Sequence, residues 1–357
     1  MEQRILKLQN SFLRQNNSAA FILSDINRFY FTGFSSSNGA LLILKDEAYF
    51  LTDFRYIGAA KHKIKHCNVL RCDNINETVN KLILEKNIEN LYLEQNTLNV
   101  KTLLKFKEIF EDISLIYDNT LDDFIEKMRM IKSDKEIEKI KIAQKITDNA
   151  FKYILNYIAP GKTEKDIALE LEFFMRKNGA ERIAFDIIAV SGKNSSLPHG
   201  VPTEKPIQKG GFLTLDFGAS VDGYKSDMTR TIGIGNIIDE QKEIYNIVLK
   251  AQTEALKLAK HGEICSNVDL AARNIIKNAG YGEYFGHATG HSVGLEIHER
   301  PVFSIKCSKI LEKNMIMTVE PGIYLPEKFG VRIEDLIIID NNTNINLTNS
   351  DKSLIIL

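Results

Sequence analysis

The strongest constraint on the fold is a repeat in the second part of the chain. Gly161 and Gly179 match Gly262 and Gly280, each pair 101 positions apart, and apolar residues align between them. The sequence pattern of each copy predicts a helix, a glycine turn and a second helix that ends at glycine, followed by strand-like segments. Any two amphipathic helices could match in this way, but both end glycines align without a gap. The pattern therefore favours a duplicated α/β half.

The 357 residues are too many for a single core of ordinary size, and about 150 residues per domain indicates two domains. In the first part, short apolar runs such as "GALLIL" alternate with helix-like stretches such as "NINETVNKLILEK", which is typical of an α/β domain. Ser133 and Glu136 then form a capping-box signal at the start of a long amphipathic helix. We expect the boundary near residue 125, with domains at 1–125 and 126–357.

Composition excludes several classes of function. The net charge is −1, so the chain lacks the basic surface of a protein that binds nucleic acid or anionic membranes. The four cysteines contain no CxxC pair, which favours reduced thiols over a disulfide framework or a sulfur-bound zinc. No apolar run approaches the ~18 residues of a membrane span. We therefore expect a cytoplasmic protein with small or neutral partners.

A predicted hairpin brings two aspartates together. Segments 210–220 and 224–235 are strand-like, with a turn signal at Asp222-Gly223 between them. If Val221-Asp222 is the turn centre, Asp216 faces Asp227 directly; if Asp222-Gly223 is the centre, the two are offset by two residues. Either register puts both carboxylates on one face, at roughly 5 Å or ~7–8 Å. Surface exposure is the usual fate of an aspartate, but Asp216 lies in an apolar strand, so a cation between the carboxylates explains the pattern better.

Two glutamates near the end of the sequence extend this acidic set. Glu320 stands at the end of an apolar strand, where Pro321-Gly322 turns the chain. Glu334 lies within a strongly apolar strand, and Arg332, two residues earlier, shares its face. Buried carboxylates in such positions indicate ligands for metal ions.

Segment 285–299 concentrates His287, His291 and His298 among glycines. The glycines make a helix costly there, so the segment is expected to be extended. In a regular strand, His291 and His298 would lie on opposite faces because they are seven residues apart. We expect one histidine to be a metal ligand and the others to contact protons or substrate, although a histidine taken alone is more often structural.

Counting charges supports a pair of divalent ions. Asp216, Asp227, Glu320 and Glu334 carry four negative charges, which two divalent ions balance, and a neutral His291 adds none. Oxygen-rich ligation with one imidazole suits Mn²⁺, Co²⁺, Fe²⁺ or Zn²⁺, and hardness favours Mn²⁺. Two ions ~3.5–4 Å apart can share a water, lower its pKa and hold a hydroxide for attack on a carbonyl.

Together these motifs resemble a known family. The segments "LDFGASVDGYKSDMTRT", "GHATGHSVGLEIHE", "TVEPGIY" and "GVRIEDL", in this order, are similar to the dinuclear metallopeptidases of the pita-bread fold: aminopeptidase P, prolidase and methionine aminopeptidase. The first part resembles the creatinase-type N-terminal domain through "INRFYFTGFSSSNGALLIL" and "YFLTDFRY". Methionine aminopeptidases lack that domain, so the resemblance implies an Xaa-Pro peptidase. The fold it implies is α/β (α+β), a creatinase-like α/β domain followed by a pita-bread catalytic domain with a pseudo-twofold internal repeat.

The resemblance also implies roles for individual residues. Asp216 would chelate one ion, Asp227 and Glu334 would bridge both, and Glu320 and His291 would complete the shell of the other ion. His199 and His298 would act at the scissile carbonyl, Glu320 would carry the proton, and His287 would line the specificity pocket. Arg332 and Tyr324, at the edge of the substrate site, would hold the metal carboxylates.

The expected function is hydrolysis of the bond between an N-terminal residue and a following proline by a metal-held hydroxide. The TDxRY pattern favours Xaa-Pro aminopeptidase, with Xaa-Pro dipeptidase (prolidase) as the alternative. A metal-free creatinase and a non-catalytic peptide-binding module are rivals, but neither would keep all five ligand positions. By resemblance we expect a homodimer that acts on peptides with proline in second position.

Overall fold

The computed structural model describes residues 1–14 and 17–357. These residues form two compact units, Met1–Arg129 and Met130–Leu357. The boundary expected near residue 125 falls inside α6 (Thr120–Met130), the helix in which the first unit ends. Within the described part of the chain, no helix combines the length and the apolar character that a membrane span requires.

The first unit is built around a mixed six-stranded sheet in the order β4-β3-β2-β1-β5-β6. Every residue of β1, β2 and β3 is buried, which explains their continuous apolar sequences. The strands are β1 (Ser18–Ile22), β2 (Ala40–Leu44), β3 (Ala48–Thr52), β4 (Asn68–Arg71), β5 (Asn90–Leu93) and β6 (Ser114–Ile116). The accompanying helices are α1 (Glu2–Ser11), α2 (Asp25–Thr32), α3 (Ile57–Lys63), α4 (Ile75–Glu85), η1 (Gln95–Thr97), α5 (Val100–Ile109) and α6.

The second unit begins with the expected long helix, and the predicted capping box of Ser133 and Glu136 is present at its start. Its first half consists of α7 (Asp134–Tyr157), α8 (Glu164–Lys177), β7 (Arg182–Ile183), β8 (Ile188–Ser191), η2 (Gly192–Ser196), β9 (Gly211–Phe217), β10 (Ala219–Val221), β11 (Tyr224–Lys225) and β12 (Met228–Ile234). Strands β12, β9 and β8 form one sheet, and β11, β10 and β7 form another.

The second half repeats this plan. It consists of α9 (Asp239–Leu258), α10 (Cys265–Asn278), η3 (Gly282–Tyr284), β13 (Gly290–Ser292), β14 (Glu299–Phe303), β15 (Ile316–Val319), β16 (Gly322–Leu325), β17 (Phe329–Arg332), β18 (Asp335–Ile339) and β19 (Asn344–Asn346). The main sheet has the order β14-β13-β15-β18-β19, and β16 pairs with β17.

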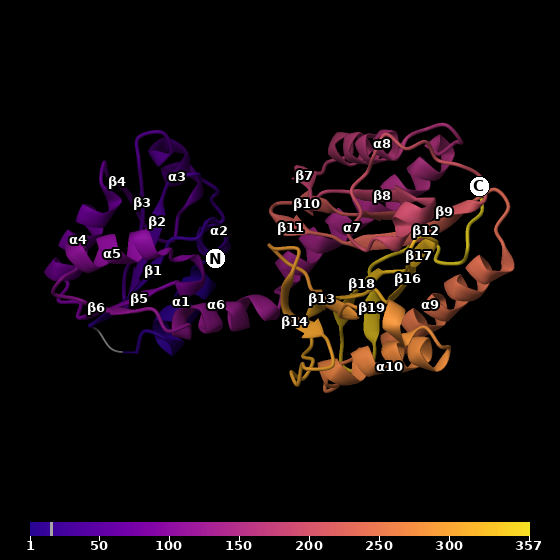
Figure 1. Ribbon diagram of the computed structural model, residues 1–357. Coiled ribbons are helices and arrows are strands. Elements are labelled where there is room, and N and C mark those ends of the chain that lie inside the picture. Colours follow the sequence, from indigo (N-terminus) through magenta and orange to yellow (C-terminus); the bar gives the residue numbers. More distant parts are fainter. Residues whose placement is uncertain (15–16) are drawn as a thin grey trace. The chain divides into compact units, whose positions relative to one another are not determined.

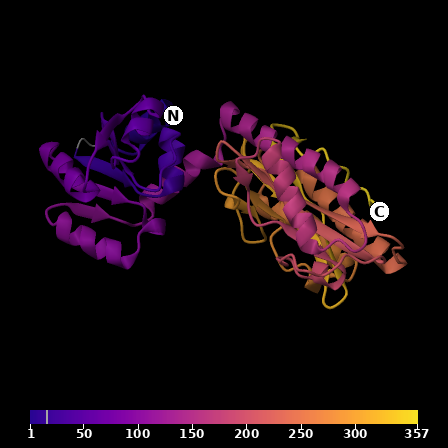
Figure 2. The same ribbon diagram turned by 90° about the horizontal axis from the view of Figure 1, so that it is seen from above.

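The internal repeat is visible in the backbone. Helices α8 and α10 both have 14 residues and start 101 positions apart. The paired end glycines Gly179 and Gly280 both have positive φ, at 104° and 90°. Helices α7 and α8 pack on the strands of the first half, and α9 and α10 pack on those of the second half. Figure 1 shows the two helix pairs on opposite sides of the strands, and Figure 2 shows α7 and α8 lying across them. The expected α/β fold with an internal repeat is confirmed.

Candidate metal centre and active site

The hairpin that carries the two aspartates adopts the second of the two possible registers. Asp216 pairs with Thr229 across β9 and β12, so the turn centre is Asp222-Gly223. Both turn residues have positive φ, 48° and 80°, as a two-residue type I′ turn requires. Asp216 and Asp227 are therefore offset by two residues, and both line the same cavity.

The other two carboxylates come from the second half. Glu320 directly follows β15, as expected, and Thr318 Oγ1 donates to its Oε1 at 3.1 Å. The prediction that Glu334 lies within a strand was wrong, because the chain breaks between β17 and β18 at that residue. Glu334 is instead held by Thr229, whose carbonyl accepts from Glu334 N at 3.1 Å and whose Oγ1 donates to Glu334 Oε2 at 2.7 Å. Asp227 and Glu334 thus occupy matching positions, each one residue before a strand.

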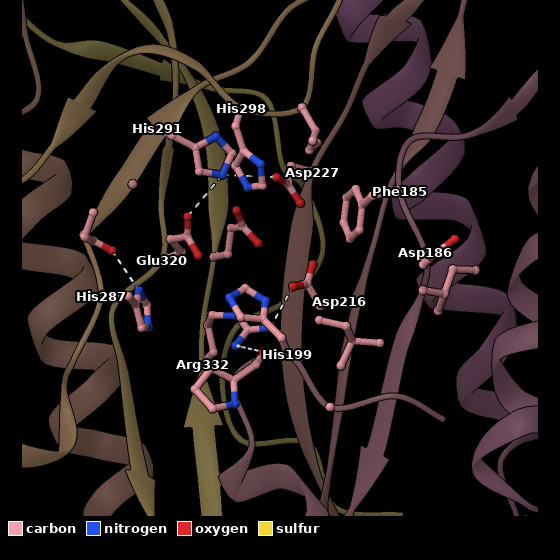
Figure 3. Close-up of a pocket in the computed structure, with 18 of the residues that line it drawn as sticks. Phe185, Asp186, His199, Asp216, Asp227, His287, His291, His298, Glu320 and Arg332 are labelled. Carbon is pink, nitrogen blue, oxygen red and sulfur yellow. Dashed lines mark hydrogen bonds and ion pairs between the residues drawn. The ribbon is translucent and has the colours of Figure 1, made fainter. Parts of the chain in front are cut away.

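His291 completes the cluster from β13. The backbone of β13 approaches β15 so closely that a Cβ on Gly290 would meet Thr318 O at 2.0 Å. This contact seats His291, whose Nε2 lies 3.3 Å from Glu320 Oε1 and 3.6 Å from Asp227 Oδ2. Figure 3 shows the imidazole pointing at both carboxylates.

The donor set fits divalent cations. One ligand atom each of Asp227, His291 and Glu334 lie within 4.8 Å of one another. Asp216 Oδ1 and Glu334 Oε1 are buried and accept no hydrogen bond from the described residues. Buried acceptors without donors are unfavourable, and a cation between them removes that penalty. The oxygen-rich set with one imidazole matches the preference of hard or borderline divalent metals.

The electrostatics of the site favour added positive charge. Burial, and then the nearby Asp216 carboxylate, raise the pKa of Asp227 well above its usual range. Burial and the Asp227 carboxylate likewise raise the pKa of Glu334. Burial opposes the charge of Glu320, but the adjacent His291 outweighs it and lowers the pKa of Glu320 to about 2. Burial also opposes the charge of His291, yet Glu320 and Asp227 raise its pKa to about 9. Without a metal, protons therefore hold the cluster together.

A chain of hydrogen bonds supports Asp216 from the side. Arg332 Nη2 donates to Asp216 Oδ2 at 2.6 Å, and its Nη1 donates to the hydroxyl of Tyr324 at 2.8 Å. The Tyr324 hydroxyl lies 2.9 Å from His287 Nε2. Arg332 and His287 line the cavity, whereas Tyr324 lies behind them and is 8% exposed. This chain fixes the orientation of a carboxylate on one side and of a histidine on the other.

The cluster opens into a cavity of about 660 Å³. His199 and His298 lie at its wall, and burial lowers the pKa of His298, which favours a neutral imidazole. His291 and His298 do not share one regular strand, so they do not lie on opposite faces. β13 ends at Ser292, the chain turns back, and Ser292 pairs with Glu299 of β14, which brings the two rings to 4.4 Å. Nine of the ten residues that the sequence indicated thus line this cavity, and the tenth, Tyr324, lies directly behind it.

Sequence reasoning missed the apolar wall and two threonines. The wall contains Phe185, Ile187, Ile188, Val201, Ile297 and Val302. Thr229 and Thr318 support Glu334 and Glu320, and both are fully buried. Thr229 lies two positions after Asp227, and Thr318 lies two positions before Glu320. Because residues two apart in an extended segment share a face, this spacing was the signal that could have found them.

Comparison with known proteins agrees with this geometry. Residues 138–341 match the model of metallopeptidase family M24, and residues 4–131 match the Creatinase/Prolidase N-terminal domain. The chain therefore belongs to metallopeptidase family M24, as the sequence motifs indicated.

Particular members of the family are similar over the full chain. An Xaa-Pro dipeptidase of Pyrococcus furiosus is 38% identical, over 99% of this chain and 100% of that protein. The structure of an Xaa-Pro dipeptidase from Bacillus anthracis has a TM-score of 0.95 at 42% identity and covers 100% of both chains. An X-Pro aminopeptidase from Thermotoga maritima has a TM-score of 0.91 at 36% identity, over 100% of this chain and 99% of that one.

Proposed function

We propose that the chain is a metal-dependent Xaa-Pro dipeptidase, which cleaves a dipeptide between its first residue and a C-terminal proline. The observation that carries the proposal is the five-member donor set at the base of a cavity whose wall holds three further histidines. The named relatives favour the dipeptidase over the aminopeptidase that the TDxRY pattern indicated, since Xaa-Pro dipeptidases are found at 38% and 42% identity over the full chain.

The five ligands have distinct duties in this proposal. Asp227 and Glu334 would be shared by two divalent ions, Asp216 would be a ligand of one, and His291 and Glu320 would be ligands of the other. When bound, the ions supply Lewis-acid activation of a water molecule and of the scissile carbonyl. We propose Mn²⁺ as the metal, because four of the five side chains are carboxylates.

The remaining side chains bind the substrate and move protons. His199 and His298 donate hydrogen bonds to the scissile carbonyl oxygen, where negative charge develops. Glu320 accepts the proton of the attacking water at a carboxylate oxygen and passes it to the proline nitrogen, which leaves as an amine. The apolar wall at Phe185, Ile297 and Val302 suits a pyrrolidine ring and excludes water.

The decisive assay compares Xaa-Pro dipeptides with Xaa-Pro-Yaa tripeptides. We expect kcat/KM to be higher for Ala-Pro than for Ala-Pro-Ala, activity to disappear on chelation, and Mn²⁺ to restore it. A preference for the tripeptide would instead identify an Xaa-Pro aminopeptidase, a second candidate favoured by the similarity to the Thermotoga maritima enzyme. Full turnover by protein verified to be metal-free would exclude both.

Assembly and location are part of the same proposal. We propose a homodimer in the cytoplasm, as the sequence resemblance implies. The mass in solution tests the first point, because a monomer would have 40.5 kDa.

A further inference from the structure

A buried carboxylate outside the metal cluster lies at the start of α8. Glu164 is 0% exposed, although a charged side chain in that position is unfavourable unless it is fully hydrogen-bonded. Its two oxygens accept hydrogen bonds at 2.6 to 3.3 Å from Ser191 N, Ser191 Oγ, Asn194 Nδ2, Thr203 N and Thr203 Oγ1. One carboxylate thus joins three residues that are far from it in sequence.

These partners are the two ends of one loop. Ser191 and Asn194 stand where the chain leaves β8, and Thr203 stands where it returns towards β9. Between them, residues 198–202 line the cavity, and His199 is among them. The middle of the loop has its own anchor, because Arg332 Nη1 donates to Pro198 O at 3.1 Å. Glu164 therefore holds both ends of the loop that presents His199.

The internal repeat provides a natural comparison. Cys265 begins α10 as Glu164 begins α8, and the backbone pairings are equivalent: Glu164 N donates to Lys205 O at 3.1 Å, and Cys265 N donates to Lys309 O at 2.9 Å. Cys265 is also 0% exposed. None of the described residues 304–311, which form the equivalent return segment, lines the cavity. The architecture accepts a thiol at this position, so the buried charge is not a requirement of the fold.

We propose that Glu164 is a positioning residue for His199: its carboxylate fixes both ends of the 191–203 loop and so sets where the imidazole meets the substrate. The inference rests on the proposed function of His199, but the anchoring of the loop can be measured separately. Gln is the same size as Glu, but only one of its two terminal atoms is an acceptor. Its amide nitrogen cannot accept a hydrogen bond from the backbone N–H of whichever loop end it faces, so one of the two ends is released.

The first experiment compares Glu164→Gln with Glu172→Gln on the same helix. Glu172 is a matched control because it pairs with Arg176 and takes no part in the loop. We expect Glu164→Gln to lower kcat on Ala-Pro by roughly 10²-fold, the effect of a misplaced catalytic group, while KM and bound metal stay at wild-type levels. The control should match the wild type. Unchanged kcat, or loss of metal in parallel with activity, would overturn the proposal.

A double-mutant cycle separates positioning from general destabilisation. In a His199→Ala background, Glu164→Gln should lower kcat by less than about 2-fold, because the group that it positions is gone. An equal loss in both backgrounds contradicts the proposal. If Glu164→Gln does not fold, Glu164→Asp keeps the charge but is one methylene too short to reach both ends, and the same comparisons apply.

Hydrogen exchange tests the anchor without activity. Backbone amides of residues 191–203 should exchange faster in Glu164→Gln than in Glu172→Gln. Equal exchange rates would overturn the proposal that Glu164 anchors this loop. If the wild type cleaves no Xaa-Pro peptide, or His199→Ala keeps wild-type kcat, the proposed function or the role of His199 fails instead. The exchange measurement then decides the anchoring alone.

Discussion

At the scale of single residues, Asp227 is the side chain on which the proposed metal site most depends. It is 4% exposed, and both burial and Asp216 disfavour its charge. Asp227→Asn should therefore lower kcat/KM by more than about 100-fold, which is what the loss of a mere supporting group can cost, and should reduce the bound metal. Metal analysis and steady-state kinetics on Ala-Pro check this.

Asp227→Asn should lower activity, but it should not lower the stability of the metal-free protein. Without metal, Asp227→Asn should be at least as resistant to urea as the wild type, because a neutral amide replaces a buried carboxylate whose ionisation the site disfavours. Asp222→Asn in the hairpin turn is the matched control, since Asn tolerates the positive φ of that position. Retention of both metal and activity in Asp227→Asn would refute its assignment as a ligand.

The titration of the metal-free site determines how stability depends on pH. Asp227 and Glu334 have raised pKa values, and the pKa of His291 is raised from 6.5 to about 9. The folded metal-free protein therefore binds more protons than the unfolded chain between about pH 6.5 and 9, so its free energy of unfolding should fall as the pH rises through that interval. Urea unfolding at pH 6.5 and 8.5 measures this. The free energy of unfolding of the metal-loaded protein should fall less over this interval. An increase in the free energy of unfolding of the metal-free form with pH would contradict the charge assignment.

At the scale of elements, the contact between β13 and β15 depends on one glycine. A Cβ on Gly290 would meet Thr318 O at 2.0 Å, whereas a Cβ on Gly286, in the same motif, would meet nothing within 4 Å. Gly290→Ala should displace His291 and cost about 1–3 kcal/mol of unfolding free energy, together with metal affinity. Gly286→Ala should stay within about 1 kcal/mol of the wild type. Equal effects of the two substitutions, measured by urea unfolding and metal titration, would show that the close approach is unimportant.

The elements also show what the sequence could and could not reveal. The strands at 40–44 and 48–52 and the capping box at Ser133 were predictable, because local patterns determine them. The break of the chain at Glu334 was not, because it depends on Thr229, 105 positions away in sequence. The proximity of the His291 and His298 rings likewise depends on the pairing of β13 with β14, which brings Ser292 and Glu299 together.

At the scale of the whole molecule, the described cavity and all five proposed ligands belong to the unit Met130–Leu357. Metal binding should therefore slow hydrogen exchange in peptides from β9, β12, β15 and β18, and should leave peptides from residues 1–129 unchanged. Exchange measured with and without Mn²⁺ tests this. Equal protection of both units would mean that the metal stabilises the chain as one cooperative block.

The duplication was the most informative global signal in the sequence, because glycines with positive φ keep their spacing when other residues diverge. It indicated that the second unit has two similar halves. It could not indicate that Asp216 and Asp227 from one half would meet Glu320 and Glu334 from the other, because that meeting depends on how the halves pack.

The two-residue turn at Asp222 and Gly223 has a consequence for how this hairpin can change in length. If the turn type is kept, an insertion of two residues adds one to each strand and leaves Asp216 opposite Thr229. An insertion of one residue shifts the pairing by one position and sends a carboxylate to the other side of the sheet, unless a bulge absorbs it. The proposed metal site should therefore accept even changes of hairpin length and, where no bulge forms, reject odd ones. Whether the number of inserted residues is even or odd then matters more than how many are inserted.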